Sequence, residues 1–360
     1  MSNKIEKTAG TPPVGADGRQ SIQSTEVSIP HSKQNSNSKK LETKSMAEIY
    51  DTVYLSKPPL IDGLLYPGTY LFAGAPKLGK SFLMAQLAYH ISVGLDMWEF
   101  SVRQGTVLYL ALEDDYHRLQ ERLYRMFGTD STDNLHFAIK APDIENGLDE
   151  QLESFMSQHP DTSLIIIDTL QKIREIGGEK YSYANDYEII ARMKEFADKH
   201  SICLLLVHHT RKQTADDKFD MISGTTGLLG AADGAFLLQK KKRTSNAATL
   251  EVSGRDQPDQ KLYISRNPET LQWELEEAET ELWQVPPEPL LEQIATLFGT
   301  ARTRWIGSAT DLCSELNLDI RPNVLTMKLN VNAGRLFKEY GIYYNTIRTH
   351  YGRTVYLWTA

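Results

Sequence analysis

Short apolar runs alternate with longer amphipathic segments through the middle of this 360-residue chain. Apolar residues dominate the runs at 69–73, 106–113, 163–168 and 202–209, as expected for buried strands. Apolar residues recur at helical spacing over residues 81–93, 119–127, 148–159 and 186–200. Because apolar strands that alternate with helices are typical of a parallel sheet covered on both faces, the pattern predicts an α/β fold with a central, mostly parallel sheet.

The pattern changes toward both ends of the chain. Short apolar stretches at 235–238, 249–252, 262–265 and 271–275 predict an antiparallel extension of the sheet, and PPEP at 286–289 indicates a linker. Helical patterns over 290–298, 308–316 and 326–341, followed by two alternating strands within 342–358, predict a winged-helix-like module. Residues 1–44 are polar and nearly lack large apolar side chains. We therefore expect a disordered tail (1–44), an α/β domain (45–285) and a C-terminal domain (286–360).

Composition narrows the class of protein. Hydrophobic residues make up 41% and charged residues 24%, which is ordinary for a globular protein. The formal net charge of −8 gives no overall case for nucleic-acid binding, so such a case has to come from local patches. Cys203 and Cys313 lie far apart in apolar surroundings, as small core residues do in a reducing compartment. With no apolar run of about 18 residues, we expect a cytoplasmic protein without a membrane span.

Residues 74–81, GAPKLGKS, fit the phosphate-binding loop G-x-x-x-x-G-K-[ST]. The loop lies between a predicted strand and a predicted helix, so an anion would meet the unpaired N–H groups of a helix N-terminus. Lys80 is expected to reach the β- and γ-phosphates and the Ser81 hydroxyl to bind Mg²⁺. The alternative is a chance Gly-Lys-Ser turn. We expect ATP and Mg²⁺ as ligands, with these residues at the nucleotide: Gly74, Ala75, Pro76, Lys77, Leu78, Gly79, Lys80, Ser81 and Phe82.

Two carboxylates end neighbouring predicted strands. Asp168 closes LIIID at the carboxyl end of its strand, which is the usual ligand edge of an open α/β sheet, and there it can hold Mg²⁺ together with Ser81. Glu113 closes TVLYLALE, where desolvation and its acidic neighbours would make it a stronger general base for the attacking water. The alternatives are that Asp168 only caps the next segment of the chain and that residues 113–115 only cap a helix. We assign Glu113 as the base, with Asp114 and Asp115 as caps.

His208 and His209 end the strand at 202–209 and precede Thr210, Arg211 and Lys212. Imidazole can bond a γ-phosphate oxygen, and we expect one of the two side chains to face the phosphates. The alternative is a pair of core histidines. A metal site is not expected, because no partner lies at ligand spacing.

These four features together resemble the RepA-type hexameric replicative helicases of the RecA superfamily: GAPKLGKS, the strand ending ALED, the strand ending IIIDTL and the strand ending VHHTRK. The resemblance covers roughly residues 60–275. It implies a RecA-like core in which Lys80 and Ser81 bind phosphate and Mg²⁺, Glu113 is the general base, Asp168 is the Walker B carboxylate and the histidine pair senses the γ-phosphate.

The same resemblance implies an arginine finger supplied by a neighbouring subunit. The family carries it on a late strand after a Gly-rich stretch, which residues 222–239 match. Arg255 in SGRD is the candidate, with Arg243 or Lys242 as substitutes, although the sequence departs from the usual family pattern here. The alternative for Arg255 is an ordinary hairpin-turn arginine.

The resemblance also implies that loops after the Walker B and histidine strands line a pore and hold single-stranded DNA. Here these are residues 170–187, with Lys172, Arg174 and Lys180, and residues 210–224, with Arg211, Lys212 and Lys218. Solvated surface is the alternative for both loops.

The C-terminal domain lies outside the resemblance. From residue 320 onward, six basic residues face one acid, Glu339, a local net charge of +5, and Tyr343, Tyr344 and Tyr351 are interleaved among them. This suits duplex DNA, and contact with replication proteins is the alternative. The six basic residues are Arg321, Lys328, Arg335, Lys338, Arg348 and Arg353.

The sequence thus favours an ATP-driven DNA helicase that forms a ring, most simply a hexamer. A role in the replication of a plasmid or mobile element is implied by the resemblance alone. A DNA-binding regulator or loader that uses its ATPase as an assembly switch is the second hypothesis. A small-molecule kinase is disfavoured, because no lid for an acceptor is evident.

Overall fold

The computed structural model describes residues 41, 43–54, 58–174, 183–211, 217–222, 226–255, 257–281, 286–299, 302–349 and 352–359. Most of the predicted tail therefore lies outside the described residues. In the N-terminal unit, Met1–Asp51, the short helix α1 (Met46–Tyr50) is capped by Ser45, whose Oγ accepts from the Glu48 N–H at 3.2 Å. The domain boundaries at 44/45 and 285/286 stay predictions.

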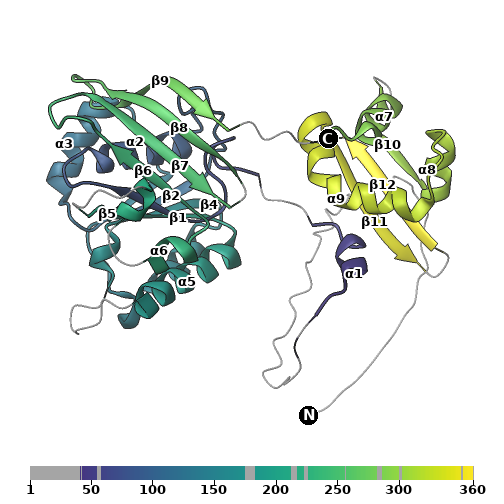
Figure 1. The fold of residues 1–360 in the computed structure, drawn as a ribbon, viewed down its shortest axis with the longest axis horizontal. Helices are drawn as coiled ribbons and strands as arrows, with labels where there is room; N and C mark the ends of the chain where they lie inside the picture. Colours follow the sequence, from purple (N-terminus) through teal and green to yellow (C-terminus); the bar gives the residue numbers. More distant parts are fainter. Residues whose placement is uncertain are drawn as a thin grey trace, which may run out of the picture. The chain divides into compact units, whose positions relative to one another are not determined.

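A nine-stranded sheet in the order β3-β2-β4-β5-β1-β6-β7-β8-β9 forms the centre of the α/β part (Figure 1). The first six strands in that order run parallel and the last three antiparallel. This confirms the predicted α/β fold with a central, mostly parallel sheet. The strands are β1 (Gly68–Gly74), β2 (Thr106–Ala111), β3 (Leu135–Ala138), β4 (Thr162–Asp168), β5 (Cys203–His209), β6 (Gly234–Gln239), β7 (Ala247–Gly254), β8 (Gln257–Arg266) and β9 (Trp273–Thr280).

Two details of the sheet differ from the expectation. Strand β6 pairs in parallel with β1, so the antiparallel extension begins one strand later than predicted. Strand β3 was not predicted, because it is only four residues long and His136 interrupts its apolar residues; none of the four is fully buried.

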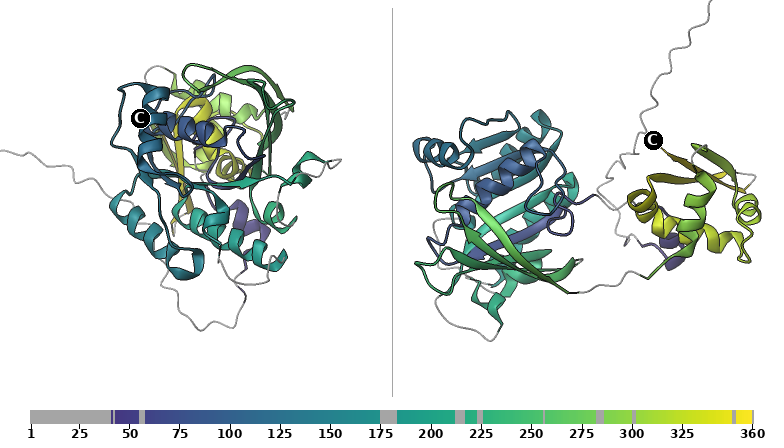
Figure 2. Two further views of the ribbon diagram at one scale, coloured as in Figure 1. Left: turned by 90° about the vertical axis from the view of Figure 1, so that its left-hand side faces the viewer. Right: turned by 90° about the horizontal axis from the view of Figure 1, so that it is seen from above.

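Helices cover both faces of the sheet, as Figures 1 and 2 show. Successive side chains of a strand point to opposite faces of the sheet. In β1, Phe72 therefore lies in the core between the sheet and helices α2 and α3, and Leu71 lies in the core on the opposite face. That second core is formed with α4, α5 and α6. The helices are α2 (Lys80–Val93), α3 (Tyr116–Phe127), α4 (Leu148–Gln158), α5 (Tyr183–His200) and α6 (Thr226–Ala231), with short 3₁₀ turns η1 (Ile144–Asn146), η2 (Leu170–Lys172) and η3 (Lys218–Met221).

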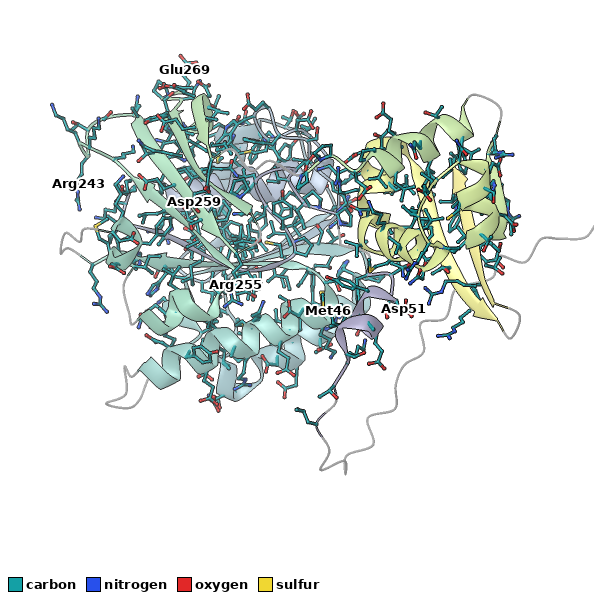
Figure 3. All side chains as sticks on the ribbon, turned by 45° about the vertical axis from the view of Figure 1, so that its right-hand side comes forward. Met46, Asp51, Arg243, Arg255, Asp259 and Glu269 are labelled. Carbon is teal, nitrogen blue, oxygen red and sulfur yellow. The ribbon has the colours of Figure 1, made fainter. Side chains whose placement is uncertain are left out.

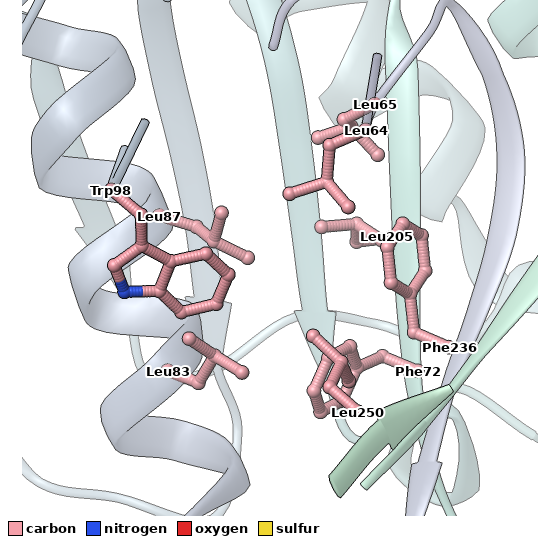
Figure 4. A pocket seen from close by; sticks show the side chains of 9 residues that line it. All are labelled: Leu64, Leu65, Phe72, Leu83, Leu87, Trp98, Leu205, Phe236 and Leu250. Carbon is pink, nitrogen blue, oxygen red and sulfur yellow. The ribbon is translucent and has the colours of Figure 1, made fainter. Parts of the chain in front are cut away.

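A small apolar cavity lies in the core between α2 and the sheet (Figure 4). Leu83, Leu87 and Trp98 lie on one side of it, and Phe72 and Leu205 are among the side chains on the other. Its volume is about 10 Å³ and every lining residue is apolar. Because a water needs at least that volume and polar partners, we interpret the cavity as a packing gap and not as a ligand site.

The C-terminal part has its own core and a three-stranded antiparallel sheet in the order β10-β12-β11. The predicted three helices and hairpin are confirmed, whereas β10 was missed because only Trp305 of its five residues is buried. Whether this part acts as a winged helix stays a prediction. Its elements are α7 (Pro289–Phe298), β10 (Arg304–Ser308), α8 (Ala309–Glu315), α9 (Pro322–Tyr340), β11 (Ile342–Thr349) and β12 (Gly352–Thr359).

Both cysteines are buried free thiols, as predicted, Cys203 in β5 and Cys313 in α8. Within the described residues, no helix combines the length and the apolar character that crossing a membrane requires.

Candidate active site

The phosphate loop joins the end of β1 to the start of α2, as the motif requires. Gly74 ends β1, and a Cβ there would come within 2.8 Å of the Leu238 carbonyl oxygen in β6. Gly79 has a φ of +103°, which side-chain-bearing residues rarely adopt. Both glycines are therefore needed for the backbone to fold back on itself before α2 begins.

Lys80 is buried at this bend, with 6% of its surface exposed. Its Nζ donates hydrogen bonds to the carbonyl oxygens of Gly74 (2.8 Å) and Ala75 (3.2 Å). Burial lowers the pKa of Lys80, while the negative charges of Asp168 and Glu113 act in the opposite direction. The ammonium group thus lies inside the loop that is predicted to hold phosphates.

Ser81 and Asp168 meet at the carboxyl edge of the sheet. The Ser81 Oγ donates to Asp168 Oδ2 at 2.7 Å, and the buried Tyr109 hydroxyl donates to the same oxygen at 2.9 Å. Burial raises the pKa of the Asp168 carboxyl, and both hydrogen bonds oppose that rise. A hydroxyl and a carboxylate oxygen are hard ligands of the kind that Mg²⁺ prefers, so this pair fits the predicted metal role.

Glu113 follows β2 and lies beside the same edge, where Thr169 Oγ1 donates to its Oε1 at 3.2 Å. Its side chain is exposed, so the expected desolvation is not found. Of its acidic neighbours, Asp115 is the N-cap of α3, as predicted, but Asp114 is not a cap. Asp114 instead forms ion pairs with Arg118 (3.1 Å) and Arg122 (2.7 Å). These arginines offset the acidic charge that was expected around Glu113.

The two histidines of β5 point to opposite faces of the sheet. His209 Nδ1 lies 3.2 Å from Lys80 Nζ, so His209 is at the phosphate loop. Burial and the positive charge of Lys80 lower the pKa of His209. His208 is 2% exposed and shares the face of Leu206, away from α2. The structure therefore brings one histidine of the predicted pair to the site.

Arg255 lies at the opposite edge of the sheet from its own phosphate loop. It follows β7, whose end pairs with the start of β6, and its guanidinium donates to the Gly230 carbonyl oxygen at 3.0 Å. Figure 3 labels Arg255 and Arg243 near opposite ends of β7. Arg243 and Lys242 precede β7, and Arg243 lines a groove with Ala75 of the phosphate loop. Arg255 is thus far from the site of its own subunit, whereas Arg243 is near it.

The predicted pore loops are described only in part, since residues 175–182, 212–216 and 223–225 lie outside the described residues, Lys180 and Lys212 among them. Lys172 and Arg211 are exposed. Arg174 is buried and forms an ion pair with Asp186 at 3.0 Å, and Lys218 pairs with Glu251. Part of the positive charge expected in these loops is therefore neutralised inside the domain.

Some of the basic and aromatic residues of the C-terminal part also have structural partners. Lys328 forms an ion pair with Glu288 (2.9 Å) and Arg335 with Glu339 (2.8 Å). Tyr344 is a core residue whose hydroxyl donates to Asn330 Oδ1 and whose pKa burial raises to about 12. Tyr343 is exposed, and Tyr351 lies outside the described residues.

Sequence reasoning missed three residues at the site. Tyr109 lies within an apolar run and looked like a core residue, and Thr169 has no motif of its own. Arg266, at the end of β8, lies beside Gly79: its Nη1 is 3.3 Å from the position that a Cβ on Gly79 would take. Only the position of Arg266 at a strand end could have indicated it.

The comparisons with known proteins concern the phosphate-loop domain. The family model described as "AAA domain" matches residues 39–215, from before β1 to just beyond β5. Of the curated proteins, none matches this sequence. Similar solved structures include one described as an ATPase domain, with 14% sequence identity and a TM-score of 0.49; the match covers 59% of this chain and 85% of that one. Another is a DnaB-like replicative helicase described with its primase interactions, with 16% identity and a TM-score of 0.48; this match covers 58% of this chain and 57% of that one. Residues 39–215, which include the phosphate loop, are thus similar to AAA domains.

Proposed function

We propose that this protein is an ATP-driven, ring-forming DNA helicase of the RepA-like type that serves replication of a plasmid or mobile element. One observation carries the proposal. Lys80, Ser81, Asp168, Glu113 and His209 gather at one edge of the sheet, while the candidate finger Arg255 lies at the other edge. A site with this division is completed when the Arg255 edge of one subunit meets the phosphate-loop edge of the next, as in a closed ring.

Each residue has a distinct task in this proposal. The loop N–H groups and Lys80 bind the ATP phosphates, and Ser81 and Asp168 hold Mg²⁺, which when bound neutralises phosphate charge. Glu113, oriented by Thr169, accepts the proton of the attacking water. His209 faces Lys80 and responds to the γ-phosphate. Hydrolysis then moves the pore loops, whose exposed Lys172 and Arg211 contact single-stranded DNA.

Subunit mixing tests the shared site. Arg255→Ala and Lys80→Ala subunits are each expected to be inactive as pure assemblies, because one lacks the finger and the other the phosphate-binding lysine. Mixed in equal amounts, they form some interfaces with both residues intact, and ATP hydrolysis recovers there. Failure to recover in mixed assemblies whose size equals that of the wild type would exclude Arg255 as a finger acting between subunits.

The second candidate function is a DNA-binding regulator or loader whose ATPase acts as an assembly switch. The observation that favours it is the separate C-terminal core with its basic helix α9 and hairpin β11–β12. A truncated chain that ends at residue 285 distinguishes the two functions. If the truncation abolishes both duplex binding and all DNA-stimulated hydrolysis, the regulator is favoured. If hydrolysis by the truncated chain is still stimulated by single strands, the helicase is favoured.

A further inference from the structure

Arg266 brings a cation of the same subunit to the outside of the phosphate loop. It is the last residue of β8, and its guanidinium carbon lies 5.5 Å from the centre of the Phe82 ring. Phe82 directly follows Ser81 in the sequence. Its Nη1 and the Trp273 ring occupy the space that a side chain on Gly79 would fill. Arg266 thus lies next to both Gly79 and Phe82, two residues of the predicted nucleotide site.

The charge of Arg266 has no acidic counterpart in the part of the chain that the structure describes. No ion pair is formed by its guanidinium there, and its buried Nε has no hydrogen-bond partner. Its charged neighbour is another cation, Lys240, whose pKa is lowered by burial and by the charge of Arg266. A half-buried guanidinium that repels a neighbouring ammonium is unfavourable unless an anion joins them.

Arg122 provides an internal comparison. Its guanidinium also lies over the Phe82 ring, at 5.1 Å, but it forms an ion pair with Asp114 at 2.7 Å. The two arginines therefore share one aromatic neighbour and differ in that Arg122 is neutralised within the fold. Arg266 alone of this pair has charge left for a ligand.

The position of Arg266 is fixed by the sheet and not by a loose loop. Arg266 pairs with Trp273 across β8 and β9, and the fully buried Trp273 donates from Nε1 to the Gly79 carbonyl oxygen at 3.3 Å. Gln86 of α2 exchanges two hydrogen bonds with the Trp273 backbone, of 2.7 and 2.9 Å. The hairpin that carries Arg266 is therefore tied to the loop and to α2.

We propose that Arg266 binds a phosphate of the nucleotide from the same subunit, at the Phe82 end of the loop. The inference rests on the proposed function, since it assumes that the loop binds a nucleoside triphosphate. A guanidinium can donate two parallel hydrogen bonds to phosphate oxygens, which suits a ligand whose charge would also relieve the repulsion between Arg266 and Lys240. Its role differs from that of Arg255, because it acts within one subunit.

Equilibrium binding of fluorescently labelled ADP and ATP tests the proposal without requiring hydrolysis. We expect Arg266→Gln to weaken binding of both by about tenfold or more, as loss of a charge-assisted hydrogen bond does. Arg266→Lys keeps the charge but not the planar fork, so its affinity is expected to lie between those of Arg266→Gln and the wild type. Thermal unfolding without nucleotide checks that each variant is folded.

Arg125→Ala is the matched control. Arg125 lies on α3 and donates to the carbonyl oxygens of Pro268 and Glu269, so it holds the same β8–β9 hairpin without lying at the loop. We expect nucleotide affinity within about twofold of the wild type for this variant. If Arg125→Ala weakens binding as much as Arg266→Gln, the effect comes from the hairpin position and the proposal is wrong.

Lys80→Ala separates failure of this inference from failure of the proposed function. If Lys80→Ala abolishes binding while Arg266→Gln binds like the wild type, Arg266 is not a ligand residue and the ATPase proposal stands. If the wild type binds no nucleotide, both fail. Mixed assemblies test the location, with nucleotide affinity as the readout. Because Arg266 and Lys80 would act in the same subunit, mixing Arg266→Gln with Lys80→Ala subunits creates no site that carries both residues, and the appearance of sites with wild-type affinity would overturn the assignment.

Discussion

Glu113 and Asp168 are carboxylates at one edge of the same sheet, yet their surroundings differ. Asp168 is buried and accepts hydrogen bonds from Ser81 and Tyr109 on one oxygen, which suits a fixed ligand. Glu113 is exposed, and among the described residues its carboxylate accepts one hydrogen bond, from Thr169, which leaves oxygen lone pairs free to face water. The contrast supports the assignment of Glu113 as base and Asp168 as metal ligand.

Glu113→Gln should lower the turnover number for ATP by about 10²–10⁴-fold, because an amide cannot accept the proton of the attacking water. Nucleotide affinity should stay close to that of the wild type, since within the described residues no hydrogen bond or ion pair joins the Glu113 side chain to the loop. Steady-state hydrolysis and labelled-nucleotide binding measure the two effects. Asp115→Asn, at the cap of α3, is the control; turnover by Glu113→Gln equal to that of this control would exclude Glu113 as the base.

His209 makes stability depend on pH. Its pKa is lowered from the ordinary value of 6.5 by burial and by Lys80, whereas Glu113 and Asp168 act to raise it. Below pH 6.5 the unfolded chain therefore takes up this proton before the folded chain does, so the free energy of unfolding falls as pH falls. His209→Asn should reduce this dependence in urea titrations. An unchanged pH dependence in His209→Asn would contradict the assigned environment.

At the residue scale, the phosphate-loop motif indicated the loop residues, and the ends of the apolar strands indicated Asp168 and Glu113. The sequence could not show which of His208 and His209 faces the phosphate loop, because that depends on the register of β5 against β1. Nor could it indicate Tyr109 or Arg266, whose partners come from other strands or from α2.

At the scale of elements, the β8–β9 hairpin is linked to the phosphate loop through Trp273 and Gln86. The Gln86 side chain is buried and satisfies both the N–H and the carbonyl of Trp273. Trp98 donates to the same carbonyl at 2.7 Å. The last strand of the sheet therefore supports the start of α2, although the two are almost 190 residues apart (187 between Gln86 and Trp273).

Gln86→Ala should destabilise the protein by about 2–4 kcal/mol, since it leaves a buried backbone N–H without its partner and removes a second hydrogen bond. Urea unfolding followed by tryptophan fluorescence measures the change. Gln120→Ala, on the exposed side of α3, should change stability by less than about 0.5 kcal/mol. A Gln86→Ala variant as stable as Gln120→Ala would show that the hairpin is not held through this side chain.

Apolar periodicity predicted the long, buried elements and failed on short or edge elements. Strands β4 and β5 are seven residues long and almost wholly buried, so their apolar runs were unambiguous. Strands β3 and β10 bury few side chains because they lie at sheet edges, where one neighbour is missing. The parallel direction of β6 was not predicted, since an apolar run gives no direction and the short spacing to β7 suggested a hairpin.

At the scale of the whole molecule, the proposed site requires two edges of the same sheet. Residues 39–215 match an AAA domain and carry the phosphate-loop edge, whereas Arg255 lies beyond that match. An isolated subunit can then bind nucleotide at one edge and should hydrolyse it slowly, because the cation for the transition state comes from a neighbour. Assembly and hydrolysis are thus coupled in the proposed ring.

Steady-state ATP hydrolysis with and without single-stranded DNA, recorded together with the size of the assembly, tests the central claim most directly. The account predicts a ring-sized oligomer whose turnover rises when single strands are added and falls to background in Arg255→Ala. A monomer whose turnover is the same with and without single strands, and is unaffected by Arg255→Ala, would contradict it.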